Sequence, residues 1–259
     1  MTPSSRHEYD DAMAAMLQLL RGEGFMVPGG KETIDRLAKG LALRDKLVLD
    51  IGSGLGGPAF VLAEDHGARV IGIDLEALLV QRAQTGAQAR GLAHRVEFLT
   101  VEQGALPFDD HSFDFVTGSN AFTRIEDKFG MFRECYRVLK PAGVLSCHDC
   151  MRTRAEYGAA MRSWLELQGL SYSLETLERH GELLEAAGFV DIELQDASEW
   201  YRSEVAREYD RIRGPLYTPI VEAVGRERAD RFVENWRAMA AVCESGEMRQ
   251  GYCRGRRPP

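Results

Sequence analysis

The residues that most directly suggest chemistry are a glycine-rich turn and an acidic residue downstream of it. Gly52, Gly54 and Gly56 follow a short apolar run, and glycines let a backbone turn tightly and approach a ligand without a Cβ in the way. Asp74 ends the next apolar run, 24 residues after Asp50. A carboxylate there can accept hydrogen bonds from both hydroxyls of a ribose. Together these features predict a nucleoside-cofactor site.

The turn fits two cofactor fingerprints, because its glycines satisfy both G-x-G-x-G and G-x-G-x-x-G. The second is the dinucleotide fingerprint, so an NAD-dependent oxidoreductase is a rival interpretation. Two features favour a cofactor with an amino-acid portion instead. Asp50 places a carboxylate just before the turn, which suits an ammonium group and is unfavourable beside a pyrophosphate. The third predicted strand is followed by Glu102 and Gln103, an acid–amide pair suited to the edge of an adenine.

The elements that must position these residues alternate between strand and helix from residue 46 onward. Near-continuous apolar strands separated by helices are typical of a parallel sheet covered on both faces, which is a doubly wound, Rossmann-like α/β fold. The strands are expected at KLVLDIG, ARVIGID, VEFLTV, FDFVTGSN, GVLSCHDC, GFVDIELQD and MRQGYCRG, and the later helices at 57–66, 76–90, 127–140, 153–169, 174–187 and in a long stretch, 199–245.

We expect a single domain, because the sequence contains no internal repeat and no Pro/Gly/Ser-rich linker. Residues 1–44 are expected to form an N-terminal helical lid, beginning with an amphipathic helix over 8–21. Residues 45–150 form the cofactor-binding core. Residues 151–259 supply acceptor-side helices and the last strands, and the helical insertion before the last strand is too long for a plain loop and suits a substrate lid.

Composition excludes several classes of protein. The 259 residues carry a formal net charge of −8, which argues against a nucleic-acid partner. No run approaches ~18 apolar residues, so no membrane span is expected. The five cysteines are an odd number and the N-terminus lacks a secretory pattern, so we expect reduced thiols and a cytoplasmic protein. The oligomeric state stays open, and a homo-oligomer is compatible with the sequence.

In order along the chain, LDIGSGLGG, VIGIDL, LPFDDHSFDFV and RECYRVLKPAGVL resemble the motifs of class I S-adenosylmethionine-dependent methyltransferases. The resemblance covers about residues 25–200 and implies a seven-stranded methyltransferase sheet with S-adenosylmethionine as cofactor. GFMVPGGKET, ECYRVLKP and the terminal GYCRGRR are most similar to phosphoethanolamine N-methyltransferases, alongside sarcosine/dimethylglycine methyltransferases.

This resemblance also implies site residues. Tyr9 has the spacing of the family's active-site tyrosine, 20 residues before Gly29, and Tyr172 matches a substrate-contacting tyrosine. Asp50 and Ser53 of the turn complete the cofactor contacts expected here. By position, the remaining cofactor contacts are Val27, Gly52, Gly54, Asp74, Leu75, Glu102, Gln103 and Ser119.

The chain departs from the family after the fourth predicted strand. The family usually has Ser-x-Asp-x-x-x-His there, whereas this chain has Asn120 in place of the Asp and Arg124 in place of the His. An amide cannot neutralise an ammonium, and a guanidinium is not a base and repels a cationic substrate. We therefore expect a small acceptor whose carboxylate or phosphate is clamped by Arg124 together with Arg254, while Tyr9 orients the nucleophile. An ion pair between Arg124 and Glu126 or Asp127 on the following helix is the alternative.

The run Cys147-His148-Asp149-Cys150 contains C-x-x-C and so suggests zinc. A structural zinc site needs four converging ligands, and no second pair exists, so we expect buried strand cysteines and no metal. Asp149 lies at the carboxyl edge of the predicted sheet and either contacts the acceptor or caps the helix that follows.

The predicted function is methyl transfer from S-adenosylmethionine to a small molecule, with N-methylation of a small amine bearing a carboxylate or phosphate preferred. S-methylation of a thioether acid is the alternative within the class. Outside the class are the NAD-dependent oxidoreductase and a cofactor-binding homologue without catalysis. In this reading Tyr9, Asn120 and Arg124 are catalytic, and Asp149, Tyr172 and Arg254 contact the acceptor.

Overall fold

A seven-stranded sheet in the order β3-β2-β1-β4-β5-β7-β6 organises the protein. The computed structural model describes residues 11–169 and 171–259. All strand pairs are parallel except those of β7, which is antiparallel to both β5 and β6. The strands are β1 (Leu47–Ile51), β2 (Arg69–Asp74), β3 (Val96–Thr100), β4 (Phe113–Ser119), β5 (Leu139–Arg152), β6 (Val190–Asp196) and β7 (Met248–Arg256).

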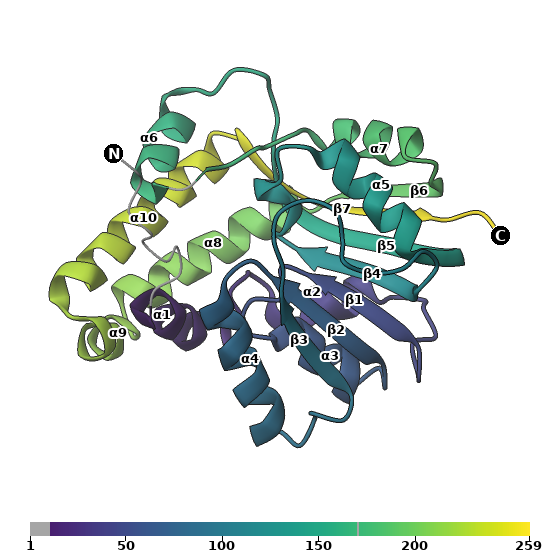
Figure 1. Cartoon of the computed structure of the whole chain (residues 1–259). Coiled ribbons are helices and arrows are strands. Elements are labelled where there is room, and N and C mark those ends of the chain that lie inside the picture. The colour runs from purple at the N-terminus through teal and green to yellow at the C-terminus, as the bar shows by residue number, and fades with distance from the viewer. Residues whose placement is uncertain (1–10, 170) are drawn as a thin grey trace, which may run out of the picture.

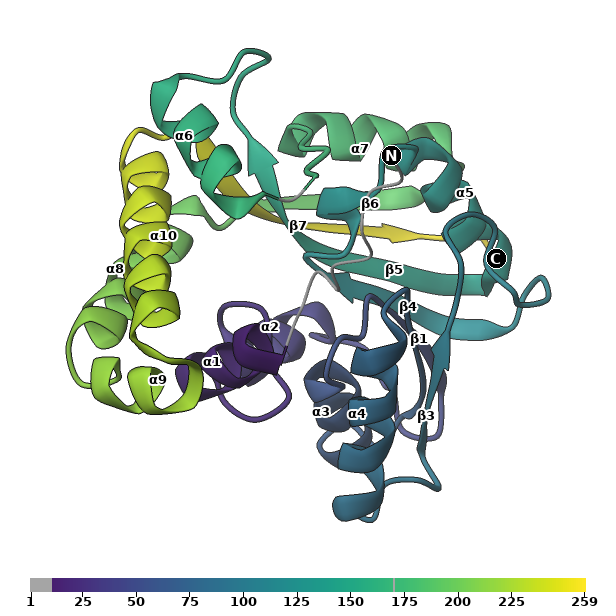
Figure 2. The same cartoon turned by 60° about the vertical axis from the view of Figure 1, so that its left-hand side comes forward.

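Helices cover both faces of this sheet, as Figures 1 and 2 show. One face is packed by α2, α3 and α4, and the other by α5 and α7. The strands are apolar on both sides for this reason, and the predicted doubly wound α/β fold is confirmed. The helices are α1 (Asp11–Arg21), α2 (Gly30–Leu37), α3 (Gly57–Glu64), α4 (Ala77–Ala89), the short 3₁₀ helix η1 (Phe122–Arg124), α5 (Lys128–Val138), α6 (Ala159–Gln168), α7 (Leu177–Ala186), α8 (Ser198–Arg213), α9 (Tyr217–Val224) and α10 (Arg226–Glu244).

Pro141 lies in a bulge inside β5. β5 begins at Leu139, paired with Phe113, and resumes its pairing with β4 where Val144 meets Phe115. The intervening residues loop out, with Ala142 at a φ of 62°. Proline lacks the N–H that a regular ladder needs, so the strand must leave its register here.

A second layer of helices stands at one end of the sheet (Figure 2). It consists of α1, α6, α8, α9 and α10, which pack around a shared apolar cluster that includes Cys150 of β5 and Met248 of β7. The predicted helical stretch 199–245 is interrupted at Gly214 and Gly225, so it forms three helices rather than one. Gly225 has a φ of 84°, which a side chain would disfavour. A lid function for these helices stays a prediction.

The five cysteines are free thiols and are all buried, as expected for the strand cysteines. Among the described residues no helix is both long enough and apolar enough to cross a membrane.

A buried ion pair joins the N-terminal helix to the helical layer. Arg21 of α1 donates to both carboxylate oxygens of Glu208 on α8, at 2.7 and 2.9 Å. Trp236 of α10 donates its indole N–H to the same carboxylate at 2.9 Å, and the Arg21 guanidinium lies 5.5 Å from the centre of the Trp236 ring. Three helices distant in sequence are therefore held at one point.

We expect Glu208→Ala to destabilise the protein strongly, because it leaves the Arg21 guanidinium buried without a counter-charge. Breaking such a pair costs about 3 kcal/mol or more, which corresponds to a fall in Tm of about 6–12 °C. Thermal unfolding followed by circular dichroism measures it. The exposed pair between Glu227 and Arg231 supplies the control, since Glu227→Ala should change Tm by less than about 2 °C. Equal effects of the two variants would contradict the buried pair's role.

Candidate functional site

The ends of five parallel strands meet at one edge of the sheet. Strand register aligns Ile51 with Ile73, Asp74 with Thr100, and Ser119 with His148. The strand order reverses at β1, which lies between β2 and β4, and ligands of open α/β sheets bind beside such a switch point. Most of the predicted site residues lie at or just after these strand ends, so the fold places them at the same edge of the sheet.

Glycine is required in the turn between β1 and α3 for two reasons, which are the backbone conformation and the close packing of neighbouring residues. Gly52 has a φ of 68° and Gly54 a φ of 53°, both in the left-handed region that glycine tolerates best. A Cβ on Gly56 would lie 2.8 Å from the rings of Phe60 and Phe98, and one on Gly57 would lie 2.6 Å from the Gly24 carbonyl. Gly52 and Gly54 therefore shape the turn, Gly57 permits close packing, and Gly56, with a φ of 88°, does both.

Asp74, at the end of β2, is tied to this turn. One carboxylate oxygen accepts the Gly54 N–H at 2.9 Å and the other accepts the Glu76 N–H at 3.0 Å. Burial raises the pKa of Asp74, while these two N–H groups act in the opposite direction. Each oxygen can accept a further hydrogen bond, so the carboxylate is held rigidly with capacity left for a ligand.

Asp50 is a buried acid with an unused oxygen. Its side chain is 1% exposed, and its Oδ2 atom has no hydrogen-bond partner. Burial, with a smaller effect of the Asp74 charge, raises the pKa of Asp50 to about 8. The buried hydroxyl of Ser53 in the same turn also lacks a partner. Unsatisfied buried polar atoms are costly, and two of them in this turn mark a place where a polar ligand would supply the missing contacts.

The rim of the turn is more open. Leu75, directly after Asp74, is 58% exposed although it is a large apolar side chain. Glu102 and Gln103 are exposed, and the backbone just before them is fixed by a hydrogen bond from Val101 N–H to the Asp74 carbonyl at 3.0 Å. Val27 is half-buried in the segment between α1 and α2. Their role as cofactor contacts stays a prediction.

A buried polar cluster lies at the exits of β4 and β5. Asn120 follows β4 with a φ of 56°, and its Oδ1 accepts the Cys150 N–H and the Gln250 side-chain N–H, each at 3.0 Å. The Ser119 hydroxyl lies 3.3 Å from Nδ1 of His148. Burial lowers the pKa of His148 to about 3, so this imidazole is neutral. Ser119 and Asn120 are thus both engaged with β5.

Asp149 points to the opposite face of β5 and holds η1. Its Oδ1 accepts the backbone N–H of Thr123 at 3.1 Å and the Thr123 hydroxyl at 2.8 Å. Burial raises the pKa of Asp149 to about 7, and its other oxygen is buried without a partner. Asp149 therefore anchors η1. It does not cap the helix that follows β5, so the predicted helix cap is wrong.

Arg124 and Tyr172 lie near one another beyond β4. The Arg124 side chain is half-buried, and its Nε donates to the Ser171 carbonyl at 3.4 Å. The Tyr172 ring packs against Trp164 of α6, with ring centres 5.2 Å apart. Asp127 caps α5 by accepting the Gly130 N–H at 2.8 Å. Tyr9, the predicted orienting residue, lies outside the described residues.

Arg254 does not reach this edge, which corrects the predicted clamp. It pairs with Ser146 in the middle of β5. Its guanidinium donates to the carbonyls of Leu37 and Lys39 at 2.8 and 3.0 Å. These carbonyls belong to the C-terminal end of α2 and its exit, so Arg254 fixes α2 to the sheet.

Two buried polar residues escaped the sequence analysis. Gln250 of β7 is fully buried; its Nε2 donates to Oδ1 of Asn120 and lies 3.2 Å from Nδ1 of His148. His180 of α7 is also fully buried, with Nδ1 2.9 Å from the Thr176 carbonyl. Their spacing carries no signal, because burial here depends on which distant strand or helix covers the residue.

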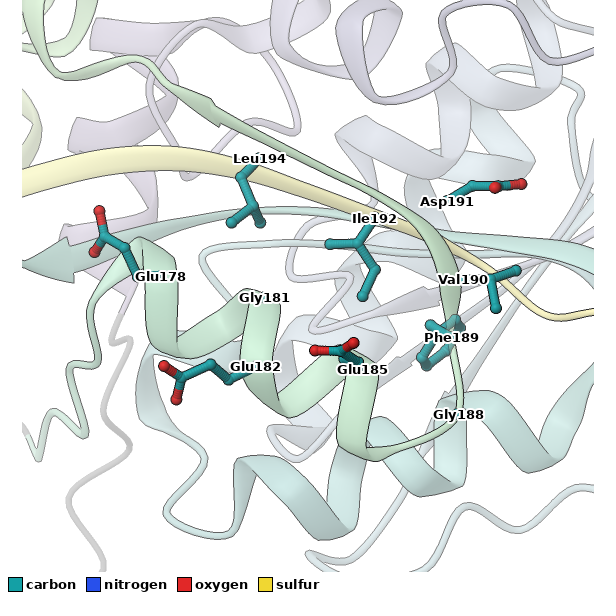
Figure 3. Close-up of a pocket in the computed structure, with 10 residues that line it drawn as sticks. All are labelled: Glu178, Gly181, Glu182, Glu185, Gly188, Phe189, Val190, Asp191, Ile192 and Leu194. Carbon is teal, nitrogen blue, oxygen red and sulfur yellow. The ribbon is translucent and has the colours of Figure 1, made fainter.

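A surface hollow between α7 and β6 is separate from this edge (Figure 3). Acidic side chains from α7 stand over apolar side chains from β6. None of the predicted site residues lines it. Its lining residues are Glu178, Gly181, Glu182, Glu185, Gly188, Phe189, Val190, Asp191, Ile192 and Leu194.

Comparison with known proteins agrees with the strand-end site. Residues 49–147 match a family model described as a methyltransferase domain, and this range contains the turn, Asp74 and Asn120. The chain therefore contains a methyltransferase domain, in agreement with the order of class I S-adenosylmethionine-dependent methyltransferase motifs along its sequence. It is 29% identical over 231 residues to phosphoethanolamine N-methyltransferase 1 of Arabidopsis thaliana, covering 89% of this chain and 46% of the relative. The chain thus spans about half the length of the plant relatives that it matches.

Shorter relatives align along most of their length. The chain is 27% identical to phosphoethanolamine N-methyltransferase of Plasmodium falciparum, over 78% of this chain and 77% of the relative. Phosphoethanolamine N-methyltransferase 2 of Haemonchus contortus, solved with phosphomonomethylethanolamine and S-adenosylhomocysteine, superposes with a TM-score of 0.91 at 23% identity. The match covers 98% of this chain and 59% of that one. The predicted methyltransferase fold is therefore confirmed, and S-adenosylmethionine is the family's cofactor.

Proposed function

We propose that this chain transfers a methyl group from S-adenosylmethionine to a small molecule, with the nitrogen of an amine that carries a carboxylate or phosphate as the preferred acceptor. The observation that carries the proposal is the pair of acids at the glycine turn. Asp74 is held by the Gly54 N–H, and the neighbouring Asp50 has a buried, unpartnered oxygen. Such a pair suits a ligand with both a ribose and an ammonium, and it does not suit a pyrophosphate. An NAD-dependent oxidoreductase is disfavoured for that reason.

In this proposal the parts of the cofactor are divided among the strand ends. Asp74 accepts the ribose hydroxyls, and Asp50 faces the ammonium. The exposed Leu75 side chain covers one face of the adenine, because burying about 100 Å² of apolar surface stabilises binding by about 2.5 kcal/mol. Glu102 and Gln103 meet the adenine edge, while Val27 and Ser53 close the turn.

Arg124 is proposed to hold the acceptor's anionic group. A guanidinium matches a carboxylate or phosphate through two parallel hydrogen bonds, and half-burial of Arg124 strengthens them. The relatives named phosphoethanolamine N-methyltransferase act on an amine with a phosphate, which is the same combination of groups. Tyr172 is proposed to flank the acceptor beside Arg124, and Tyr9 to orient its nucleophile.

S-adenosylmethionine, when bound, would supply an electrophilic methyl group on a sulfonium, with S-adenosylhomocysteine as the leaving group. The chain's residues then have to align the acceptor's lone pair and exclude water. A base is needed only when the acceptor must lose a proton. An amine that arrives uncharged or releases its proton to water needs none, so replacing the family's Asp and His by Asn120 and Arg124 leaves this chemistry feasible.

The test is incubation with methyl-labelled S-adenosylmethionine and a panel of small amines, amino acids, phosphobases and thioether acids. Mass spectrometry measures labelled product and S-adenosylhomocysteine. Labelled N-methyl product from an amine with an anionic group is expected. Product from thioether acids alone would move the assignment to sulfur, and binding of S-adenosylhomocysteine without turnover of any acceptor would favour a non-catalytic homologue.

We predict that the affinity for S-adenosylhomocysteine rises with pH. Because burial raises the pKa of Asp50 to about 8, this carboxyl is protonated in the free protein below pH 8 and must lose its proton to face an ammonium. Between pH 6 and 8 the Kd should therefore fall by up to about tenfold per pH unit, and it should level off above pH 8. Titration calorimetry in buffers of different ionisation enthalpy counts the released protons.

Asp50→Asn is the matched control for this prediction, since it keeps the shape and removes the titration. It should bind more weakly at pH 8 and lose the extra slope. The ligand's own amine titrates equally with both proteins, so identical pH profiles for the two would rule out the role of Asp50.

A further inference from the structure

The amide of Asn120 is oriented by its neighbours. Its Oδ1 accepts the backbone N–H of Cys150 and the side-chain N–H of Gln250, each at 3.0 Å. A backbone N–H can only donate, so the atom facing Cys150 must be the oxygen. Both lone pairs of that oxygen are therefore occupied.

Gln250 is itself fixed by its other contacts. It is 0% exposed, and its Oε1 accepts the Cys150 thiol at 3.1 Å. Its Nε2 also lies 3.2 Å from Nδ1 of His148, which accepts in the tautomer that carries the proton on Nε2. Reversing the Gln250 amide would set its oxygen against the oxygen of Asn120. The cluster therefore admits one orientation of both amides.

The Asn120 side chain can offer a ligand only hydrogen-bond donors. With its oxygen occupied, Asn120 has only its two N–H donors left, and within residues 11–169 and 171–259 no hydrogen bond from Nδ2 is formed. Asn120 is half-buried at the exit of β4, four residues before Arg124. A guanidinium also has donors and no acceptor. Both residues that replace the family's Asp and His thus offer donors alone.

We propose that Gln250 is a positioning residue that makes Asn120 a hydrogen-bond donor, so that the methyl acceptor presents an anionic oxygen, and not an ammonium, to the exit of β4. This inference rests on the proposed function and specifies which end of the substrate lies there. The substrate class is a small acceptor with a carboxylate or phosphate close to its nucleophile, held by Asn120 and Arg124 together.

The experiment compares acceptors that differ by one anionic group, phosphoethanolamine against ethanolamine and sarcosine against dimethylamine. Binding to the protein loaded with S-adenosylhomocysteine is measured by calorimetry, and kcat/KM by methyl transfer. The wild type should favour the anionic member of at least one pair by tenfold or more. Equal affinity within both pairs, or no binding of any of the four, would overturn the inference.

Asn120→Asp is the decisive variant. One carboxylate oxygen keeps the donors from Cys150 and Gln250, and the other becomes an acceptor in place of the amide N–H. The preference for the anionic member should fall by about tenfold or more, while the Kd for S-adenosylhomocysteine stays within about twofold. An unchanged preference would overturn the inference.

Gln250→Met tests positioning, because it fills similar space without hydrogen-bonding groups. It should reduce the same preference in the wild-type background and have little further effect when combined with Asn120→Asp, since a carboxylate offers an acceptor in either orientation. A merely structural role would instead lower Tm and give additive effects. Additive losses would overturn the positioning role.

The two proposals fail in different ways. A wild type that binds the anionic acceptors preferentially but transfers no methyl to any acceptor refutes the proposed function and supports the orientation of Asn120. Methyl transfer whose preference for anionic acceptors is unchanged by Asn120→Asp and by Gln250→Met supports the proposed function and refutes the proposed role of Asn120.

Discussion

Asp74→Ala is expected to raise the Kd for S-adenosylhomocysteine about 100-fold. The carboxylate is proposed to accept two hydrogen bonds from the ribose, and hydrogen bonds to a charged group contribute about 1.5–3 kcal/mol each. A loss of about 3 kcal/mol corresponds to a factor of about 100 in Kd. The same change removes the acceptors for the Gly54 and Glu76 N–H groups, which loosens the turn. Titration calorimetry measures the effect.

Asp74→Asn is the matched variant for this prediction. Its amide retains one oxygen, so it can still accept from the Gly54 N–H or from a hydroxyl but lacks the charge, and its Kd should fall between those of the wild type and the alanine variant. Thermal unfolding of both variants separates lost binding from lost folding. A folded Asp74→Ala protein that binds as tightly as the wild type would remove Asp74 from the cofactor site.

Arg124→Ala is expected to lower kcat/KM for the anionic acceptor by about 100-fold, chiefly through KM. The guanidinium is proposed to form a two-bonded clamp on a carboxylate or phosphate, and a clamp that binds ground state and transition state alike affects KM more than kcat. Arg124→Lys keeps the charge without the fork, so an intermediate loss is expected. Steady-state kinetics at saturating S-adenosylmethionine provide the measurement.

Arg231→Ala is the control for that prediction. Arg231 lies on α10 with 70% of its side chain exposed and pairs with Glu227, so its removal should leave the kinetics unchanged. Cofactor binding by Arg124→Ala should also match the wild type, because Arg124 is not among the cofactor contacts. An unaltered KM for Arg124→Ala would show that another group holds the acceptor's anion.

Much of the core could be predicted because it depends on local pattern. The apolar runs that became β1 to β5, and the glycines and acids at their ends, are set by short-range alternation of strand, turn and helix. Asp74 was expected beside the turn, and it contacts Gly54 directly. Parallel strands bring their carboxyl ends to one edge whatever the details of packing, so position in the chain was sufficient there.

The positions of residues predicted to contact the acceptor depend on long-range contacts instead. Arg254 was expected at the site, but the antiparallel register of β7 places it opposite Ser146, within reach of α2. Capping of a following helix was one alternative for Asp149, but its carboxylate accepts from Thr123, which precedes it by 26 residues; its contact with the acceptor stays a prediction. Neither outcome is encoded in the spacing of neighbouring residues.

By itself, the sequence determined the class of fold, the glycine turn and the acids that flank it, because backbone conformation at glycine and the alternation of apolar runs are local properties. Only the tertiary structure decided how the Asn120 amide is oriented. Gln250 reaches Asn120 across 130 residues of chain, and its Nε2 donates to the Asn120 Oδ1 atom. A hydrogen bond has a direction. The partner that folding brings to an amide therefore determines whether the oxygen or the N–H groups of that amide are left for other contacts.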